Sequence, residues 1–175
     1  TYYPHEFFAA SMSMELSNQK KLSEFYEELK RLNIEIVRPD INKCFSDFTS
    51  NGKQFFYALG AIKNVGYEAI SNIVKERETN GEYKNLSDFI KRVDPKDINK
   101  LQLEGLVRAG AFDNLNDNRQ SIYNSIPNII LKSKNNFENK QANQFDLFND
   151  KLSNEENILD DIEDWNIDIR LTKEF

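Results

Sequence analysis

Residues 62–66 combine side chains that could build a binding site for a phosphate group. In Ile62-Lys63-Asn64-Val65-Gly66, Asn64 tolerates a positive φ angle, Val65 can anchor the turn in the core, and Gly66 lets the backbone approach a ligand. We expect the N–H groups at and after Gly66 to point outward, because a helix with an apolar stripe begins there. An uncapped helix N-terminus offers free donors and partial positive charge to a phosphate oxygen, and Lys63 adds a full charge beside it.

Residues 102–115 form a second unit of the same kind. The sequence QLEGLVRAGAFDNL predicts an apolar helix and a turn of small residues around Gly110, with Arg108 and Arg119 nearby. Both units look like helix-hairpin-helix motifs, which would hold the DNA backbone without reading base edges. The candidate DNA contacts are therefore Lys63, Asn64, Val65, Gly66, Arg108, Gly110 and Arg119, and binding is expected to be nonspecific and salt-dependent. The alternative is that residues 62–66 are only a turn between two helices.

Residues 143–148, NQFDLF, place three apolar side chains in a tail otherwise rich in Asn, Lys, Asp and Glu. The segment Gln144-Phe145-Asp146-Leu147-Phe148 resembles the peptide through which bacterial replication proteins bind the sliding clamp. Leu147 and Phe148 would fill an apolar pocket, and Gln144 would make directional hydrogen bonds at its edge. The alternative is that these apolar side chains pack on the protein's own helices or cap a short helix.

The first third of the chain predicts two helices and a small β element. Pro4 suits the first turn of one helix, Asn18 can cap the next, and Asn33 can adopt a left-handed stop. Residues 34–37 then alternate as a short strand, and the Asn51-Gly52 pair predicts a hairpin.

From Gly60 onward the pattern becomes one of short helices separated by tight turns. Gly110 is expected to end one helix, Asn118 to cap another, and Pro127 to interrupt the latter. Residues 133–157 are mostly polar and predict a flexible linker. One further helical stripe is formed by Ile158, Ile162, Trp165 and Ile169. The expected fold class is mainly α with a small β element, followed by a tandem helix-hairpin-helix domain and a flexible acidic tail.

The charge of the chain is unevenly distributed. The formal net charge is −6, yet residues 135–175 hold 4 basic and 11 acidic side chains, whereas residues 53–110 hold 10 and 8. The mildly basic middle permits a DNA contact. No stretch approaches the roughly 18 apolar residues of a membrane span, and the N-terminus has no signal-peptide pattern. A single cysteine and a single histidine exclude an internal disulfide and a Cys/His metal cluster, so a cytoplasmic setting without membrane contact is expected.

Several stretches together resemble the bacterial DNA polymerase III alpha subunits, which are C-family replicative DNA polymerases. They are YYPHEFFAASMS, RLNIEIVRPDIN, YALGAIKNVGYEAISNIVKERETNGEYKNLSDFIKRVD, INKLQLEGLVRAGAFDNL and the NR pair at 118–119. The resemblance implies that residues 1–58 end a fingers domain and that residues 59–131 form a tandem helix-hairpin-helix domain. It also implies a linker with the clamp-binding motif at 132–157 and a helix at 158–175 leading to an OB-type domain.

The resemblance also implies where catalysis occurs. In this family, two-metal nucleotidyl transfer depends on palm-domain aspartates, which would precede Thr1. The chain is therefore expected to be inactive alone and to bind no cofactor, with Mg²⁺ held in the palm domain. The acidic run Asp160, Asp161, Glu163 and Asp164 fits a solvated face better than a metal site.

Three partners follow from the resemblance: double-stranded DNA, the beta sliding clamp, and other subunits of the replicative holoenzyme. The alternative is a protein of a different class, namely a stand-alone helix-hairpin-helix module of a repair enzyme or a protein-interaction scaffold. The N-terminal helix in PHEFFAASMS and the strand in RLNIEIVRPDIN favour the polymerase, because a repair module needs neither.

Overall fold

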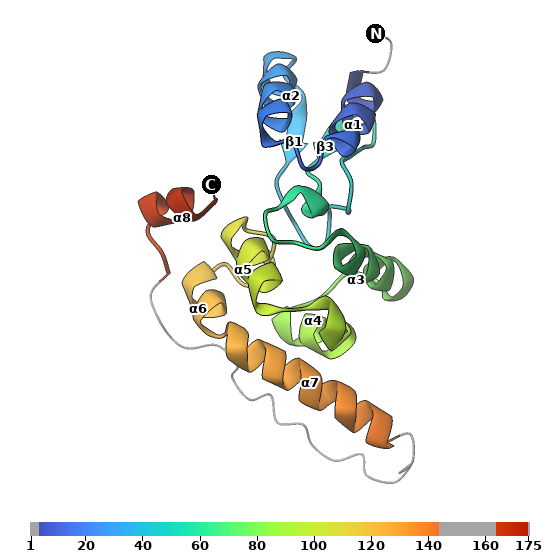
Figure 1. Ribbon diagram of the computed structural model, residues 1–175, viewed down its shortest axis with the longest axis vertical. Coiled ribbons are helices and arrows are strands. Elements are labelled where there is room, and N and C mark those ends of the chain that lie inside the picture. Colours follow the sequence, from blue (N-terminus) through green and yellow to red (C-terminus); the bar gives the residue numbers. More distant parts are fainter. Residues whose placement is uncertain (1–3, 144–163, 175) are drawn as a thin grey trace.

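The computed structural model describes residues 4–143 and 164–174 (Figure 1). Its elements are α1 (Pro4–Met14), α2 (Gln19–Arg31), β1 (Glu35–Val37), β2 (Thr49–Ser50), β3 (Gln54–Phe56), η1 (Leu59–Ala61), α3 (Tyr67–Asn80), α4 (Leu86–Arg92), η2 (Pro95–Asp97), α5 (Lys100–Arg108), α6 (Arg119–Asn124), α7 (Ile126–Asn143) and α8 (Ile167–Glu174). This confirms the expected class, mainly α with a small β element. Among the described residues, no helix is both long and apolar enough to span a membrane.

The local signals that end and begin the first two helices act as predicted. α1 begins at Pro4, where a missing N–H costs nothing. Asn18 caps α2, and its Oδ1 accepts a hydrogen bond from the Lys21 N–H at 3.3 Å. Asn33 has φ 55°, so the chain leaves the helix in the left-handed conformation and enters β1.

The small sheet joins α1 and α2 to the rest of the molecule. Its strand order is β1-β3-β2, with β1 parallel and β2 antiparallel to β3. The Asn51-Gly52 turn connects β2 to β3, and Gly52 has φ 82°. Phe8, Leu29, Phe48 and Phe55 are among the residues of the core between this sheet and the two helices. Figure 1 shows α1, α2 and the sheet at one end of the molecule and α3 to α7 at the other.

Helices α3 to α7 pack around a second and larger core. Phe89 lies at its centre, with edge-on rings of Tyr83 and Phe112 at 5.0 and 5.1 Å between centroids. Gly110 has φ 79° and follows the end of α5, as expected. Asn118 caps α6, and a new helix begins at Ile126, so the predicted break before Pro127 is confirmed.

The prediction of a flexible linker from residue 133 is wrong over its first residues, because α7 continues to Asn143. Tertiary packing supplies the stability that the polar composition does not predict. Ser133 is 1% exposed, and Phe137 lies over a hollow shared with the end of α4. The Lys140 ammonium group also donates a hydrogen bond to the Lys91 carbonyl oxygen. The rest of the expected linker lies outside the described residues.

The prediction that Trp165 lies on an apolar helical stripe near the C-terminus is also wrong, because Trp165 precedes α8. Its ring packs against Tyr123 of α6, with 5.2 Å between ring centroids. The preceding Asp164 accepts a hydrogen bond at Oδ1 from the Gln120 N–H at 2.9 Å. The segment therefore has a partner within the chain. Ile158 and Ile162 lie outside the described residues.

Candidate nucleic-acid interface

The first hairpin consists of η1, the turn at residues 62–66 and α3. Asn64 has φ 66°, which confirms the conformation expected of it. The Val65 N–H donates to the Ile62 carbonyl oxygen at 3.1 Å and closes the turn. The Val65 side chain is 9% exposed and belongs to the larger core, whereas Lys63, Asn64 and Gly66 are exposed. The turn therefore presents its polar residues to solvent and anchors itself through the valine.

The N-terminus of α3 is uncapped. Gly66 is its N-cap residue and has no side chain to accept from the first turn. Within the described residues, the N–H groups of Tyr67, Glu68 and Ala69 have no hydrogen-bond acceptor, and the first helical bond runs from the Ile70 N–H to the Gly66 carbonyl oxygen. Asparagine side chains cap α2, α4, α5 and α6. The three amides of α3 thus keep their donor capacity.

The amide of Gly66 itself is engaged, which corrects the expectation that donors at Gly66 are free. Its N–H donates to Gln102 Oε1 of α5 at 3.2 Å. The available donors therefore begin one residue later, at Tyr67. Sequence reasoning missed Gln102, since its residue type and its place on α5 carry no signal of a contact 36 residues away.

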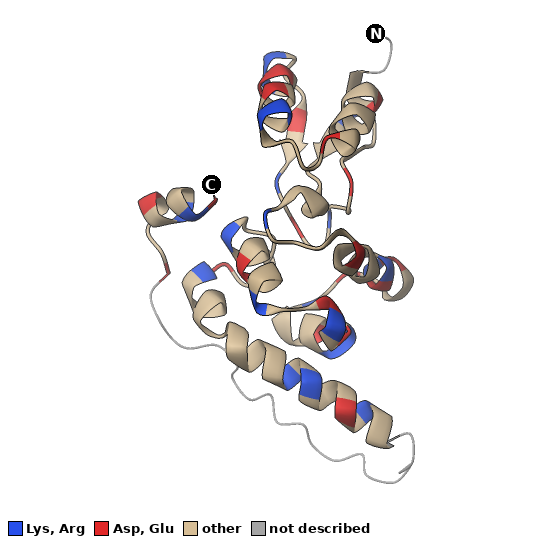
Figure 2. Ribbon diagram, in the orientation of Figure 1, with Lys and Arg blue, Asp and Glu red and all other residues tan. Residues whose placement is uncertain are grey.

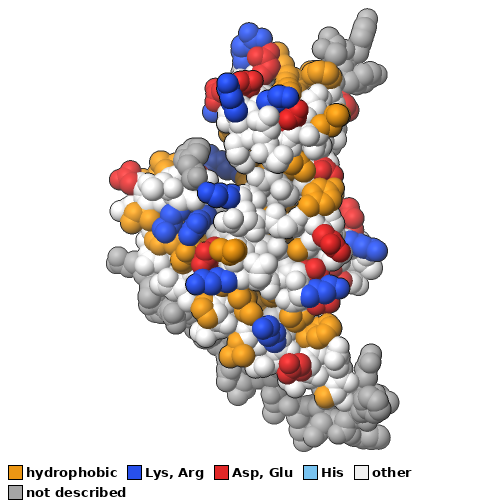
Figure 3. Space-filling view, viewed as in Figure 1, with side chains coloured by type: hydrophobic (Ala, Val, Ile, Leu, Met, Phe, Trp, Pro, Cys, Tyr) orange, Lys and Arg blue, Asp and Glu red, His pale blue; other side chains and the backbone are white. Residues whose placement is uncertain are grey.

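Charges around the α3 N-terminus are mixed. Lys63 is exposed beside the turn, but Glu68 lies in the first turn and Asp47 accepts from the Tyr67 hydroxyl at 2.6 Å. This hydrogen bond raises the pKa of Tyr67, so the phenol stays a neutral donor. Figure 2 shows basic and acidic residues interspersed along the helices, and Figure 3 shows side chains of both signs on the face in view. A phosphate would be held mainly by backbone amides.

The structure places Arg119 in the interior, as a structural residue rather than as an exposed DNA ligand. It is 6% exposed, and its guanidinium binds both oxygens of Asp113, at 2.9 and 2.8 Å, and Glu174 Oε1 at 2.6 Å. It also donates to the Arg108 carbonyl oxygen at 3.1 Å. Burial works to lower the pKa of Arg119, but the hydrogen bonds that its guanidinium donates to Asp113 and Glu174 outweigh burial and raise the pKa.

Gly110 lies against this arginine. A Cβ at Gly110 would meet the Arg119 guanidinium and the Asp113 carboxylate, which would have to move, and the positive φ of Gly110 disfavours any side chain there. Arg108 is half-buried, stands 5.3 Å from the Tyr123 ring centroid and donates to the Tyr123 hydroxyl at 2.8 Å. The second unit thus directs one of its two arginines inward and leaves Arg108 partly accessible.

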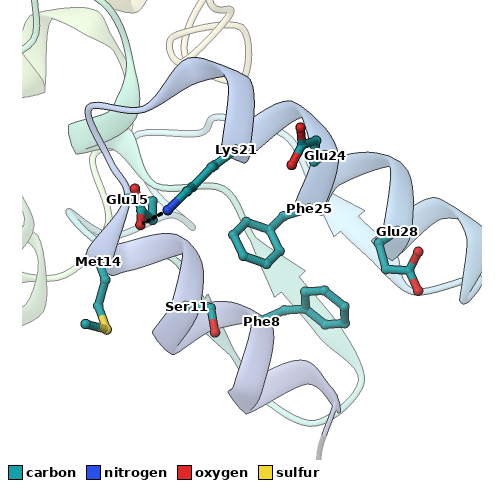
Figure 4. Close-up of a pocket in the computed structure, with 8 residues that line it drawn as sticks. All are labelled: Phe8, Ser11, Met14, Glu15, Lys21, Glu24, Phe25 and Glu28. Carbon is teal, nitrogen blue, oxygen red and sulfur yellow. Dashed lines mark hydrogen bonds and ion pairs between the residues drawn. The ribbon is translucent and has the colours of Figure 1, made fainter.

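The described part of the chain also contains a hollow outside the two hairpins. A hollow of about 450 Å³ lies between α1 and α2 (Figure 4). It is lined by Phe8, Ser11, Met14, Glu15, Lys21, Glu24, Phe25 and Glu28. Lys21 is paired with Glu15 at 2.6 Å, and none of these eight residues is a histidine or a cysteine. The described residues contain no group of three or more metal-ligating side chains.

The single cysteine, the acidic run and the tail motif remain to be placed. Cys44 is fully buried, and burial raises the pKa of its thiol to about 11, so it is an inert core residue. Asp164 of the acidic run forms an ion pair with Arg170, a role unlike that of a solvated face. The tail motif at 144–148 lies outside the described residues.

These features are those of a helical hairpin module, and comparison with known proteins agrees with this motif. A family model described as a helix-hairpin-helix motif matches residues 33–122, about half of the chain, and the chain belongs to this family. The curated relatives are more specific. DNA polymerase III subunit alpha of Caulobacter vibrioides is 39% identical over 163 residues, which cover 93% of the chain and 14% of the relative.

Two further alpha subunits give the same result. The protein of Borreliella burgdorferi is 39% identical over 146 residues, covering 83% of the chain and 13% of the relative. The protein of Thermus aquaticus is 40% identical over 116 residues, which cover 66% of the chain and 10% of the relative. The chain therefore corresponds to a segment of a DNA polymerase III alpha subunit, and it spans about one seventh of the length of such relatives.

Proposed function

We propose that this chain binds the backbone of duplex DNA nonspecifically, with the N-terminus of α3 as its principal phosphate contact. The observation that carries the proposal is the uncapped first turn, in which Tyr67, Glu68 and Ala69 keep unpaired amides within the described residues. Backbone amides at a helix N-terminus grip an oxyanion without reading sequence. Lys63 and Asn64 flank the amides, and Arg108 supplies an additional cation.

A change at Gly66 tests this contact directly. Gly66 has φ −76°, and a Cβ there would meet neighbours no closer than 3.4 Å, so a side chain fits. In Gly66→Asp, the new carboxylate would cap the free amides and repel phosphate. Duplex affinity, measured by fluorescence anisotropy, is expected to fall about tenfold, which corresponds to the loss of one charge-assisted contact.

The matched control is Gly66→Ala, which adds a Cβ at the same place but no acceptor. It is expected to bind duplex like the unchanged chain. Affinity should also fall steeply with salt and vary little with DNA sequence. Equal affinities for the Asp and Ala variants, or binding that is insensitive to salt, would overturn the phosphate contact at α3.

The whole protein is proposed to carry out template-directed DNA synthesis, on the basis of its relatives' name. We infer that the segment itself is noncatalytic and that Mg²⁺ and the reacting groups belong to the palm domain. Primer extension by this chain alone is expected to be undetectable with Mg²⁺ and all four nucleotides. Metal-dependent incorporation by the purified chain would show that the catalytic residues have been misplaced.

A second contact is proposed between Gln144-Phe145-Asp146-Leu147-Phe148 and the beta sliding clamp, in the cytoplasm and alongside other holoenzyme subunits. Its support is the order of residue types, since Gln144 is followed at the third and fourth positions by Leu147 and Phe148. A stand-alone repair or scaffold module is disfavoured, because the similarity to alpha subunits extends over 93% of the chain, beyond the helix-hairpin-helix region.

A further inference from the structure

The turn of the first hairpin rests directly on α5. A Cβ built on Gly105 would stand 2.6 Å from the Lys63 carbonyl oxygen and 3.2 Å from Val65 Cγ2. A distance of 2.6 Å is shorter than real Cβ contacts, and the atom it would meet is backbone. Glycine is therefore required here so that the backbone of the turn can approach the helix closely.

Gln102 lies three residues before Gly105 on the same helix and uses both ends of its side-chain amide. It is 2% exposed. Its Oε1 accepts from the Gly66 N–H at 3.2 Å, and its Nε2 donates to the Asp97 carbonyl oxygen. Because both groups are buried or partly buried, each bond fixes an orientation that solvent cannot supply. The Gln102 side chain therefore ties Gly66, the residue directly before α3, to α5 and η2.

A second bridge, to the side chain of Asp97 instead of its carbonyl oxygen, holds the body of α3. The Asn72 side-chain amide donates to Asp97 Oδ1 at 3.0 Å, and Asp97 is 7% exposed. This bond joins α3 to η2 without involving residues 62–66. Removing this bond is therefore a control: it loosens α3 but leaves the contact between Gln102 and Gly66 in place.

We propose that Gln102 and Gly105 are positioning residues for the phosphate contact, a role that rests on the proposed duplex binding. Gln102 takes the one amide that precedes the helix, and Gly105 admits the Lys63 carbonyl, so the turn that leads into the amides of residues 67–69 is held in place against α5. Converging donors bind an oxyanion well only when their geometry is set in advance. Neither residue needs to touch DNA.

The first test replaces Gln102 with Met, which keeps the length of the side chain but loses both hydrogen bonds. Hydrogen exchange at the Gly66 amide is expected to speed up at least about tenfold, since the amide loses its acceptor. Duplex affinity of the full chain is expected to fall about fivefold. Asn72→Ala is the control, and it should leave both exchange at Gly66 and duplex affinity near those of the unchanged chain.

The second test is Gly105→Ala, which displaces the turn without removing a hydrogen-bonding group. It should also lower duplex affinity about fivefold. The double variant with Gln102→Met should lose less affinity than the product of the two single fold-changes, because both substitutions act on the same turn. Unchanged affinity in Gln102→Met with an exposed Gly66 amide would overturn the positioning role, as would an equal loss in Asn72→Ala. Absence of duplex binding by the unchanged chain would instead overturn the proposed function itself.

Discussion

Replacing Leu147 and Phe148 together with alanine is expected to abolish capture of the chain by a bacterial beta sliding clamp. Burying two such side chains contributes roughly 4 kcal/mol, at about 2 kcal/mol each, which is close to a thousandfold in affinity. A short peptide also loses freedom on binding, so the starting affinity is expected to be micromolar or weaker. The double variant should then show no binding in a surface plasmon resonance titration with immobilised clamp.

The matched control for this change is Leu131→Ala on α7. Leu131 is 59% exposed, so its truncation removes a surface leucine without disturbing the core or the motif. Both variants should keep the duplex affinity of the unchanged chain. Retained clamp capture by the double variant would return Phe145, Leu147 and Phe148 to the alternative reading, in which they pack on the protein's own helices.

The two proposed contacts would reinforce each other, because a clamp that encircles DNA would share the duplex that the hairpin is proposed to bind. Tethering converts the second contact into an intramolecular one, and the overall affinity then exceeds that of either contact alone. Mixed charges around α3 and a short tail peptide are consistent with this arrangement, since neither contact has to be strong. A chain that held DNA tightly at one site would slide less easily along it.

Local features of the fold were predictable from short stretches of sequence. Asn18 and Asn118 are caps, Asn33 is a left-handed stop and Pro127 marks a break, because each depends on its own neighbours in the chain. The positive φ of Asn64 belongs to the same kind of feature. The conformation of the turn at residues 62–66 was predictable for this reason, since the turn is contiguous, whereas the engagement of the Gly66 amide by Gln102 was not.

Features that depend on distant partners were not predictable. Gln102 acts on Gly66 across 36 residues, and Arg119 binds Glu174 across 55 residues. An arginine near a hairpin resembles a phosphate ligand in sequence, and only the fold shows that carboxylates already surround it. The extension of α7 to Asn143 likewise depends on packing against α4, which composition does not reveal.

The burial of Arg119 leads to a prediction about stability. Arg119→Met keeps the aliphatic stem but leaves Asp113 and Glu174 facing each other without a cation. Removing one partner of a buried ion pair is strongly destabilising, and partial exposure of both carboxylates reduces the cost. The free energy of unfolding is expected to fall by about 2 to 4 kcal/mol, measured by urea denaturation. Duplex affinity, measured where the variant is folded, should change little.

Arg31→Met serves as the control, because Arg31 is also an arginine paired with a carboxylate but its side chain is 75% exposed. An exposed pair contributes little, so its loss should change the free energy of unfolding by less than about 1 kcal/mol. The opposite pattern for Arg119→Met, full stability with lost duplex binding, would restore Arg119 as a DNA contact. Destabilisation without loss of duplex binding would instead show that Arg119 in the second unit serves to join α5, α6 and α8. The phosphate contact would then lie at α3.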